Sequence, residues 1–149
     1  MPVWEVMSPA PIAVHPETTL GELIALFEQH DYNGFPVVDN QRILRGLVTK
    51  LDLLRVLRPD PEFHLPDLTA VSGREIRLIM RLGVVTVEPD DLAAAAADLM
   101  VSTGLRSLPV VERTSGAPVL IGMLSRSDLL RGLEVETSAP TIFSLGRKE

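Results

Sequence analysis

One pattern of residues occurs twice in this chain, and the repetition limits the folds that the chain can adopt. Residues 46–57 read GLVTKLDLLRVL and residues 122–133 read GMLSRSDLLRGL. Earlier landmarks recur with a constant spacing of 73 residues: Met7 and Met80, Val14 and Val87, Pro16 and Pro89, and the runs FPVV at 35–38 and LPVV at 108–111. Because self-similarity at a fixed period is typical of folds built from repeated units, the sequence predicts two copies of one unit.

The two closing phrases lie 76 residues apart instead of 73, so the second copy contains three additional residues. They fall between its PVV run and its glycine, where ERTSGAPVLI (112–121) replaces the shorter DNQRILR (39–45). Ser115, Gly116 and Pro118 are residues typical of turns. Because insertions are tolerated best in turns, we expect a lengthened turn between two strands.

The order of elements follows from the periodicity of the apolar residues. A short extended stretch, PIAVH (11–15) or GVVTVE (83–88), leads through a proline into a helix. In the first copy Thr19 and Glu22 have the spacing of a capping box. The helix that they begin carries one apolar stripe, formed by Leu20, Leu23, Ile24 and Phe27.

The second half of each unit reads as a hairpin and a helix. The runs FPVV and ILRGLV, separated by Asp39 and Asn40, predict two antiparallel strands. A second helix follows from Thr49, with an apolar side that we expect to contain Leu51, Leu54 and Leu57. The predicted fold class is therefore α/β (α+β), with the unit β-α-β-β-α present twice.

Four regions follow from this pattern. We expect a first repeat at residues 1–58, a linker at 59–77, a second repeat at 78–133 and a C-terminal tail at 134–149. The linker is predicted from its prolines, at positions 59, 61 and 66, and from Gly73, because these residues are typical of loops. The tail carries apolar residues in a polar setting, namely Ile142, Phe143 and Leu145, and could cover the body of the protein or a partner.

Composition excludes several classes of function. The 149 residues include no cysteine, which rules out disulfides and thiolate chemistry. A net charge of −6 opposes non-specific binding to nucleic acid, and the absence of a leader or a long apolar run predicts a soluble cytoplasmic protein. The three histidines, His15, His30 and His64, lack the spacing of metal ligands, and no catalytic motif is present. We therefore expect neither a metal site nor an enzyme.

The closing phrase has two interpretations. Each copy reads Gly, two apolar residues, Thr or Ser, two residues and Asp, which is also the signature of a helix N-cap. A hydroxyl at a strand-to-helix turn also lies beside free backbone N–H groups that suit a phosphate, and an Asp one turn later could accept hydrogen bonds from ribose hydroxyls. Both interpretations use the same residues.

Two β-α-β-β-α units, each with a PVV strand and a closing G-x-x-[T/S]-x-x-D phrase, resemble a tandem pair of CBS domains, known as a Bateman module. The resemblance covers residues 7–57 and 80–133. It implies a regulatory module whose units pack by their sheets about a pseudo-two-fold axis. The clefts between them would bind an adenosine-containing ligand such as AMP, ADP, ATP or S-adenosylmethionine. The resemblance also implies a homodimer, and because no further domain is recognisable here, we expect a separate effector protein to be regulated in trans.

The resemblance assigns roles to particular residues. Thr49 and Ser125 would bind phosphate or ribose, and Asp52 and Asp128 would bind the ribose hydroxyls. The residues before each PVV run would complete the sites: Tyr32 and Asn33 in the first copy, Leu105 and Arg106 in the second. Two basic residues follow the hydroxyls and would supply positive charge, Lys50 and Arg126. Ile12 and Val85 would line the base pockets, unless they belong to the core.

Two hypotheses about function remain open. Arg106 and Arg126 make the second copy the more basic, so a ligand sensor would have two sites of unequal affinity. The alternative is a ligand-free dimerisation or scaffolding module. Its contact would be the helix containing Ala93 to Ala97, whose small side chains allow another backbone to approach closely. The same alanines could equally pack on the sheet of their own copy.

Overall fold

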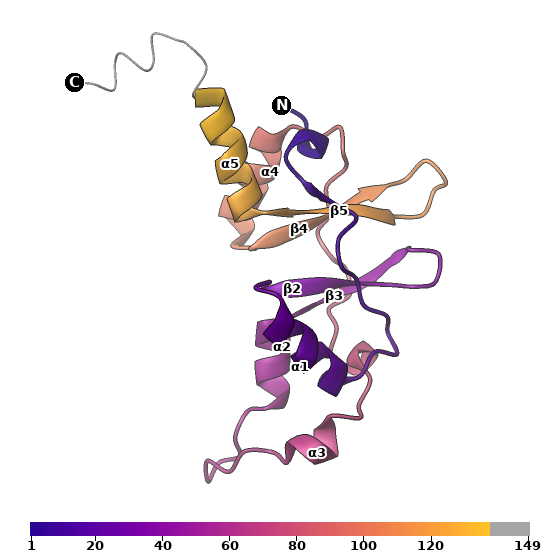
Figure 1. The fold of residues 1–149 in the computed structure, drawn as a ribbon, viewed down its shortest axis with the longest axis vertical. Coiled ribbons are helices and arrows are strands. Elements are labelled where there is room, and N and C mark those ends of the chain that lie inside the picture. Colours follow the sequence, from indigo (N-terminus) through magenta and orange to yellow (C-terminus); the bar gives the residue numbers. More distant parts are fainter. Residues whose placement is uncertain (138–149) are drawn as a thin grey trace, which may run out of the picture. The chain divides into compact units, whose positions relative to one another are not determined.

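A computed structural model describes residues 1–137. These residues form two compact units (Figure 1). Unit 1 contains Met1–Pro11, Thr86–Val111 and the described residues from Ile121 onward, and unit 2 contains Ile12–Val85 and Glu112–Leu120. Both units combine helices with antiparallel strands, which confirms the predicted mixed α/β fold with two repeats.

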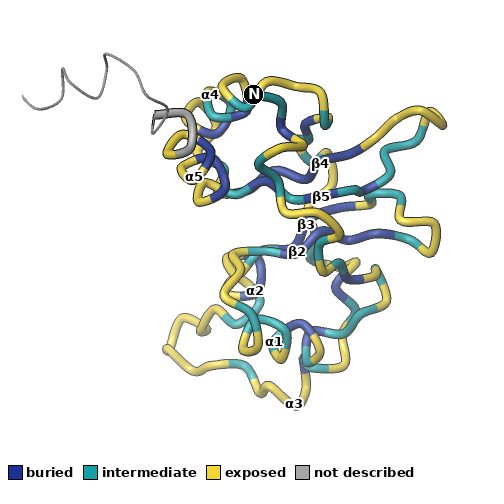
Figure 2. Tube along the Cα trace, turned by 45° about the horizontal axis from the view of Figure 1, so that its top comes forward, coloured by how far each residue is buried: buried dark blue, intermediate teal, exposed yellow. Residues whose placement is uncertain are grey.

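Unit 2 is built mainly from the first copy. Its elements are α1 (Leu20–Gln29), β2 (Gly34–Val38), β3 (Leu44–Thr49), α2 (Lys50–Val56), α3 (Leu68–Val71) and the 3-10 turn η2 (Ile76–Leu78). Strands β2 and β3 form the predicted hairpin, with Phe35 opposite Val48 and a register irregularity between Val37 and Val38. Figure 2 shows buried positions along both strands and exposed positions around α3.

Helix α1 begins where its capping box predicts. The N–H of Glu22 donates to Thr19 Oγ1 at 3.2 Å, and the N–H of Thr19 donates to Glu22 Oε1 at 2.9 Å. The backbone and hydroxyl hydrogen bonds from Thr19 lower the pKa of the Glu22 carboxyl below its ordinary value. The predicted apolar stripe is confirmed: Leu20 and Leu23 are buried, and Ile24 and Phe27 pack against the same core.

Helix α2 packs on the core with the side that contains Leu53. Leu53 is buried there, and Val56 and Leu57 pack beside it. Leu51 and Leu54 are half or more exposed, so of the three leucines predicted to share one side only Leu57 packs on the core. The physical reason is that Asp52 is itself buried, together with its neighbour Leu53.

Unit 1 is built mainly from the second copy. Its elements are the 3-10 turn η1 (Val3–Glu5), β1 (Ser8–Pro9), α4 (Ala93–Thr103), β4 (Ser107–Glu112), β5 (Val119–Ser125) and α5 (Arg126–Thr137). The strands follow the order β1-β5-β4. Ala96 is buried in the core with Val110 and Leu124, so one side of the alanine run packs on its own unit, while Ala94 and Ala95 are exposed. Helix α4 ends at Gly104, which adopts a positive φ of 74°.

The first extended stretch of each copy forms a single parallel bridge. Val14 pairs with Val37 in unit 2, and Val87 pairs with Val110 in unit 1. The N–H of Val14 donates to Pro36 O at 2.9 Å, and the N–H of Val87 donates to the equivalent Pro109 O at 3.0 Å. The predicted strands 11–15 and 83–88 are therefore reduced to one equivalent residue each.

Each copy begins with a segment that completes the unit of the other copy. Ser8 and Pro9 pair with Met123 and Gly122 in unit 1. In unit 2 the backbones of Arg81 and Leu47 exchange two hydrogen bonds of 2.8 and 3.0 Å. The stretch predicted as a linker also contributes to unit 2, because Val71 and Ile76 are buried in its core.

The lengthened turn of the second copy lies between β4 and β5, as predicted, and its end hydrogen-bonds to the backbone at residues 42–44. Within unit 2, the N–H of Leu44 donates to Pro118 O and the N–H of Leu120 donates to Arg42 O, both at 2.9 Å. Helix α5 continues to Thr137, past the predicted start of the tail, and residues 138–149 with Ile142, Phe143 and Leu145 lie outside the described residues. Over residues 1–137, no helix has the length and apolarity to cross a membrane.

Candidate ligand-binding site

The closing phrase of the first copy forms a capping box at the start of α2. Thr49 N–H and Thr49 Oγ1 donate to Asp52 Oδ2 at 2.8 and 2.9 Å, and the N–H of Asp52 returns to Thr49 Oγ1 at 3.2 Å. One carboxylate oxygen is thus fully used by the threonine. The capping interpretation of the sequence is realised here by the same residues that the resemblance assigns to a ligand.

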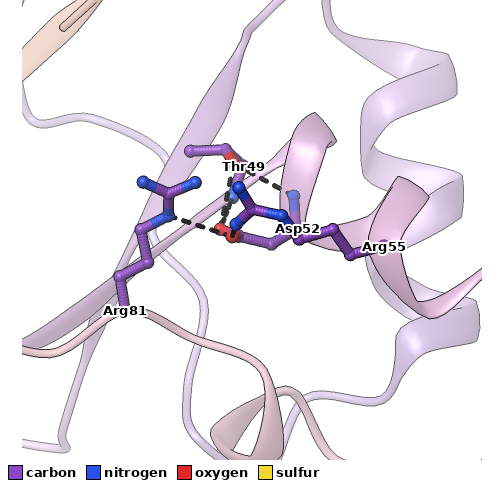
Figure 3. A network of polar contacts seen from close by, with 4 residues as sticks. All are labelled: Thr49, Asp52, Arg55 and Arg81. Atoms are coloured by element: carbon purple, nitrogen blue, oxygen red, sulfur yellow. Dashed lines mark hydrogen bonds and ion pairs between the residues drawn. The ribbon is translucent and has the colours of Figure 1, made fainter.

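The second carboxylate oxygen of Asp52 faces two arginines (Figure 3). Arg81 Nε donates to Asp52 Oδ1 at 2.9 Å, and Arg55 Nη1 lies 3.5 Å from the same oxygen. Asp52 is only 4% exposed. A buried carboxylate requires paired charge or hydrogen bonds, and these donors provide both.

The second copy repeats this arrangement in unit 1 with different partners. Ser125 N–H donates to Asp128 Oδ2 at 2.8 Å, and the N–H of Asp128 donates to Ser125 Oγ at 3.1 Å. Arg131 forms a short ion pair with Asp128 Oδ1, and Ser8 Oγ donates to that oxygen at 3.4 Å. Asp128 is also 4% exposed, and these two aspartates are the buried charged or polar side chains of the described chain.

The opening segment of each copy, at Ser8–Pro9 and at Arg81, is called the exchanged segment below because it belongs to the unit of the other copy. The glycines of the closing phrases allow these exchanged segments to reach the aspartates. A Cβ added at Gly46 would lie 2.7 Å from Arg81 O and 3.1 Å from Met80 Sδ. A Cβ at Gly122 would lie 2.5 Å from Met7 Sδ and 3.1 Å from Ser8 O. At Gly46 only glycine leaves room for the backbone of Arg81, whereas at Gly122 an added Cβ would meet chiefly the flexible end of Met7. Each closing phrase therefore has a glycine where the opening segment of the other copy approaches it.

The residues before the PVV runs are mostly exposed. Tyr32 stacks on His30 with 5.4 Å between ring centroids, and the backbone oxygen of Asn33 accepts from the Lys50 N–H at 2.9 Å. Arg106 is exposed and Leu105 is half-buried. The structure places Asn33 beside the start of α2 through the backbone, and shows no side-chain contact that joins Arg106 to Asp128.

The two basic residues after the hydroxyls have other contacts. Lys50 Nζ lies over the ring of Phe27, 5.9 Å from its centroid. Arg126 donates from Nη2 to Gly104 O at 3.0 Å and from Nε to Leu105 O at 3.3 Å, and so caps the end of α4. In this structure Arg126 stabilises helix α4 and contacts the residue before the PVV run through its backbone.

Ile12 and Val85 occupy equivalent positions at the start of the bridged stretches. Both are more than one third exposed, and neither belongs to a core cluster. The interpretation of these residues as core was therefore wrong. Their assignment to base pockets stays a prediction.

Sequence reasoning missed four polar residues that contact the aspartates, namely Ser8, Arg55, Arg81 and Arg131. Arg55 and Arg131 stand three residues after their aspartates within the repeated phrase, and this helical spacing was a signal for an ion pair. Ser8 and Arg81 each follow the aligned methionines, but no pattern within one copy shows that they serve the other. Among residues 1–137, no group of three or more His, Asp or Glu could hold a metal ion.

Comparison with known proteins defines the class to which this fold and these paired sites belong. The family model of the CBS domain matches residues 3–59 and again residues 74–135. The chain is a member of the CBS-domain family and contains two CBS domains in tandem.

Individual relatives agree with this assignment. The chain is 34% identical over 133 residues to a CBS domain-containing protein of Dictyostelium discoideum, an alignment that covers 86% of this chain and 88% of the relative. It is similar to the crystal structure of CBSX2 in complex with AMP, with 27% identity, a TM-score of 0.74, and 91% and 98% of the two chains covered. The CBS domain pair of protein MJ0100, in complex with 5′-methylthioadenosine and S-adenosyl-L-methionine, shares the fold with 22% identity, a TM-score of 0.71, and 91% and 98% covered.

Proposed function

We propose that this CBS pair is a regulatory module that binds an adenosine-containing ligand at its hydroxyl and aspartate pairs, Thr49 with Asp52 and Ser125 with Asp128. The observation that carries the proposal is the pair of equivalent, buried carboxylates, each held in a fixed orientation at the start of a helix. A fixed carboxylate suits the vicinal hydroxyls of a ribose, because its oxygens accept two hydrogen bonds side by side. AMP in the similar CBSX2 structure makes adenine nucleotides the first ligands to test.

The ligand would regulate by changing the partners of the arginines. A ribose that binds Asp52 or Asp128 must share or replace hydrogen bonds that now come from Arg55, Arg81 or Arg131. Arg81 belongs to a segment that leads into the second copy, so its release would alter the structure of that segment. A ligand that prefers one arrangement shifts the population toward it, and a separate effector protein would respond to the change.

A binding and thermal-shift experiment tests this function. The purified protein is heated with AMP, ADP, ATP, S-adenosylmethionine or 5′-methylthioadenosine, beside a double variant, Asp52→Asn with Asp128→Asn. A ligand at a hundred times its Kd should stabilise the protein by about 2.7 kcal/mol, a rise of several degrees in Tm. The double variant should lose the rise, whereas the exposed control Asp98→Asn should retain it.

The result also decides between the two hypotheses about function. If none of these ligands shifts the wild-type protein, the sensor proposal is contradicted and the aspartates serve only as helix caps. The ligand-free scaffolding module then becomes the better account. Exposed leucines on α2 and α5, such as Leu51, Leu54 and Leu130, would favour self-association of that module or of the proposed homodimeric sensor.

A further inference from the structure

The two equivalent aspartates differ in how completely their oxygens are used. Asp52 Oδ2 accepts from the N–H and the hydroxyl of Thr49, while its Oδ1 faces Arg81 and Arg55. A carboxylate offers about four lone-pair positions, and three of them accept hydrogen bonds from Thr49 and Arg81. The Arg55 guanidinium forms an ion pair at 3.5 Å with the same oxygen as Arg81. A ribose hydroxyl that approaches Asp52 would therefore compete with these groups.

Asp128 is less completely paired. Its Oδ2 accepts from the Ser125 N–H, and its Oδ1 faces Arg131 and the hydroxyl of Ser8. The Ser8 contact is long, at 3.4 Å, and a neutral hydroxyl on a single bond can rotate away at little cost. Among the described residues, the hydroxyl of Ser125 accepts a hydrogen bond but donates none, so its hydrogen is available to a ligand.

The copies differ in how many guanidinium groups face each aspartate. Arg55 and Arg131 are equivalent, but Arg131 donates a direct hydrogen bond to Asp128 Oδ1, whereas Arg55 forms only an ion pair at 3.5 Å with Asp52 Oδ1. Asp52 is faced by Arg81 in addition to Arg55, and Asp128 by Arg131 alone. Arg81 and Ser8 are also equivalent, because each follows the aligned methionine at a spacing of 73 residues. The first copy thus has a charged donor at 2.9 Å where the second has a neutral donor at 3.4 Å.

Arg81 is well held in this position. The backbone of Arg81 exchanges two hydrogen bonds with Leu47 on β3, which fixes the start of the side chain beside Asp52. The guanidinium then reaches the carboxylate through Nε, as Figure 3 shows. A charge-assisted bond to a carboxylate that is 4% exposed is stronger than a neutral one, so a ligand must overcome it to bind.

We infer that Arg81 weakens ligand binding at the Thr49–Asp52 site, so that the Ser125–Asp128 site has the higher affinity of the two adenosyl-ligand sites. Arg81 acts here as a specificity-determining residue that competes with the ribose hydroxyls for Asp52 Oδ1. This inference rests on the proposed function, since it ranks two sites for the same class of ligand. It assigns the inequality of the two sites to residues in the exchanged segments.

Calorimetric titration of the full chain with AMP, and separately with uncharged adenosine, tests the inference. In an Asp128→Asn background only the Thr49–Asp52 site remains, and Arg81→Ser should there tighten both ligands about tenfold. In an Asp52→Asn background, Ser8→Arg should weaken both ligands about tenfold. Matched controls in the same backgrounds are Arg77→Ser, an exposed arginine paired with Glu75, and Ser115→Arg in the exposed turn, and neither should change the affinity.

The outcomes separate this inference from the function on which it rests. If wild-type protein binds AMP and Arg81→Ser leaves the affinity unchanged, the inference is wrong while the proposed function stands. Weaker AMP binding by Arg81→Ser also overturns it, because Arg81 would then be a contact for the phosphate. If neither ligand binds the wild type or any variant, the proposed function fails and the inference fails with it.

Discussion

The close approach of Arg81 to Gly46 predicts that alanine at this glycine destabilises unit 2. The new methyl group would lie 2.7 Å from the backbone oxygen of Arg81. That oxygen cannot move independently, because it accepts the Leu47 N–H at 3.0 Å and the Arg81 N–H donates back to Leu47 O at 2.8 Å. Relief of the clash must therefore separate two hydrogen-bonded backbones.

The expected cost can be estimated from three contributions. Overpacking at a rigid contact costs about 1–3 kcal/mol. Weakening of the two backbone hydrogen bonds adds about 1 kcal/mol to this cost. Alanine also lowers the conformational entropy of the unfolded chain, which stabilises the folded state by about 0.4–1 kcal/mol and offsets part of the cost. A net destabilisation of about 2 kcal/mol follows, which lowers Tm by roughly 4–8 °C in a chain of this size.

The equivalent glycine provides the comparison. At Gly122 the nearest atom is Met7 Sδ, the flexible end of a side chain, so Gly122→Ala should cost about 1 kcal/mol or less. At Gly73 an added Cβ meets nothing within 4 Å, and Gly73→Ala should be neutral or slightly stabilising. Thermal unfolding followed by circular dichroism measures all three. If Gly46→Ala unfolds at the same temperature as Gly73→Ala, the exchanged segment is not held against β3 and the argument is refuted.

Two further predictions concern the helices of unit 2. Leu53→Ala should lower the free energy of unfolding by about 2–4 kcal/mol, measured by chemical denaturation, because Leu53 is buried. Leu54→Ala on the exposed side should change it by less than about 0.5 kcal/mol. Equal costs for the two variants would contradict the observed orientation of α2. Because hydrogen bonds from Thr19 lower the pKa of Glu22, this carboxylate stabilises the folded state above its ordinary pKa of 4.5, and the contribution is lost as the pH falls through the lower folded-state value. The Tm difference between wild type and Glu22→Gln should therefore be full at neutral pH and disappear in strong acid, and a difference independent of pH would show that the capping box is not ionised.

The sequence was sufficient to predict those elements that depend on neighbours along the chain. The capping boxes at Thr19 and Thr49 arise from residues three positions apart, and the hairpin of β2 and β3 from two apolar runs joined by a short polar turn. The three-residue insertion was placed correctly because a turn is the only part of a hairpin that can lengthen without a change of register. The family assignment rests on the same local patterns, present twice in register.

Features that depend on distant contacts were less predictable. Leu51 and Leu54 have the spacing of a buried face, but Asp52, which pairs with Arg81 29 residues away in the sequence, is buried together with its neighbour Leu53 instead. The predicted first strands shorten to one bridge each, since only Val14 and Val87 lie against a neighbouring strand. Ile12 and Val85 are apolar and yet exposed, and their composition alone gives no reason for it.

The exchange of opening segments explains why the binding chemistry could not be derived from one copy at a time. Within the first copy, Asp52 has Thr49 and Arg55 as partners, and the second copy offers Asp128 the same set in Ser125 and Arg131, so the two sites look alike. The residues that distinguish them, Arg81 and Ser8, are contributed by the opposite copy in each case. Each copy keeps its own closing phrase, but the exchanged segment that it contributes to the other copy can differ in sequence. The two sites can therefore differ in affinity while both closing phrases stay intact. A difference between the copies should therefore be sought in the exchanged segments before it is sought in the repeated phrase.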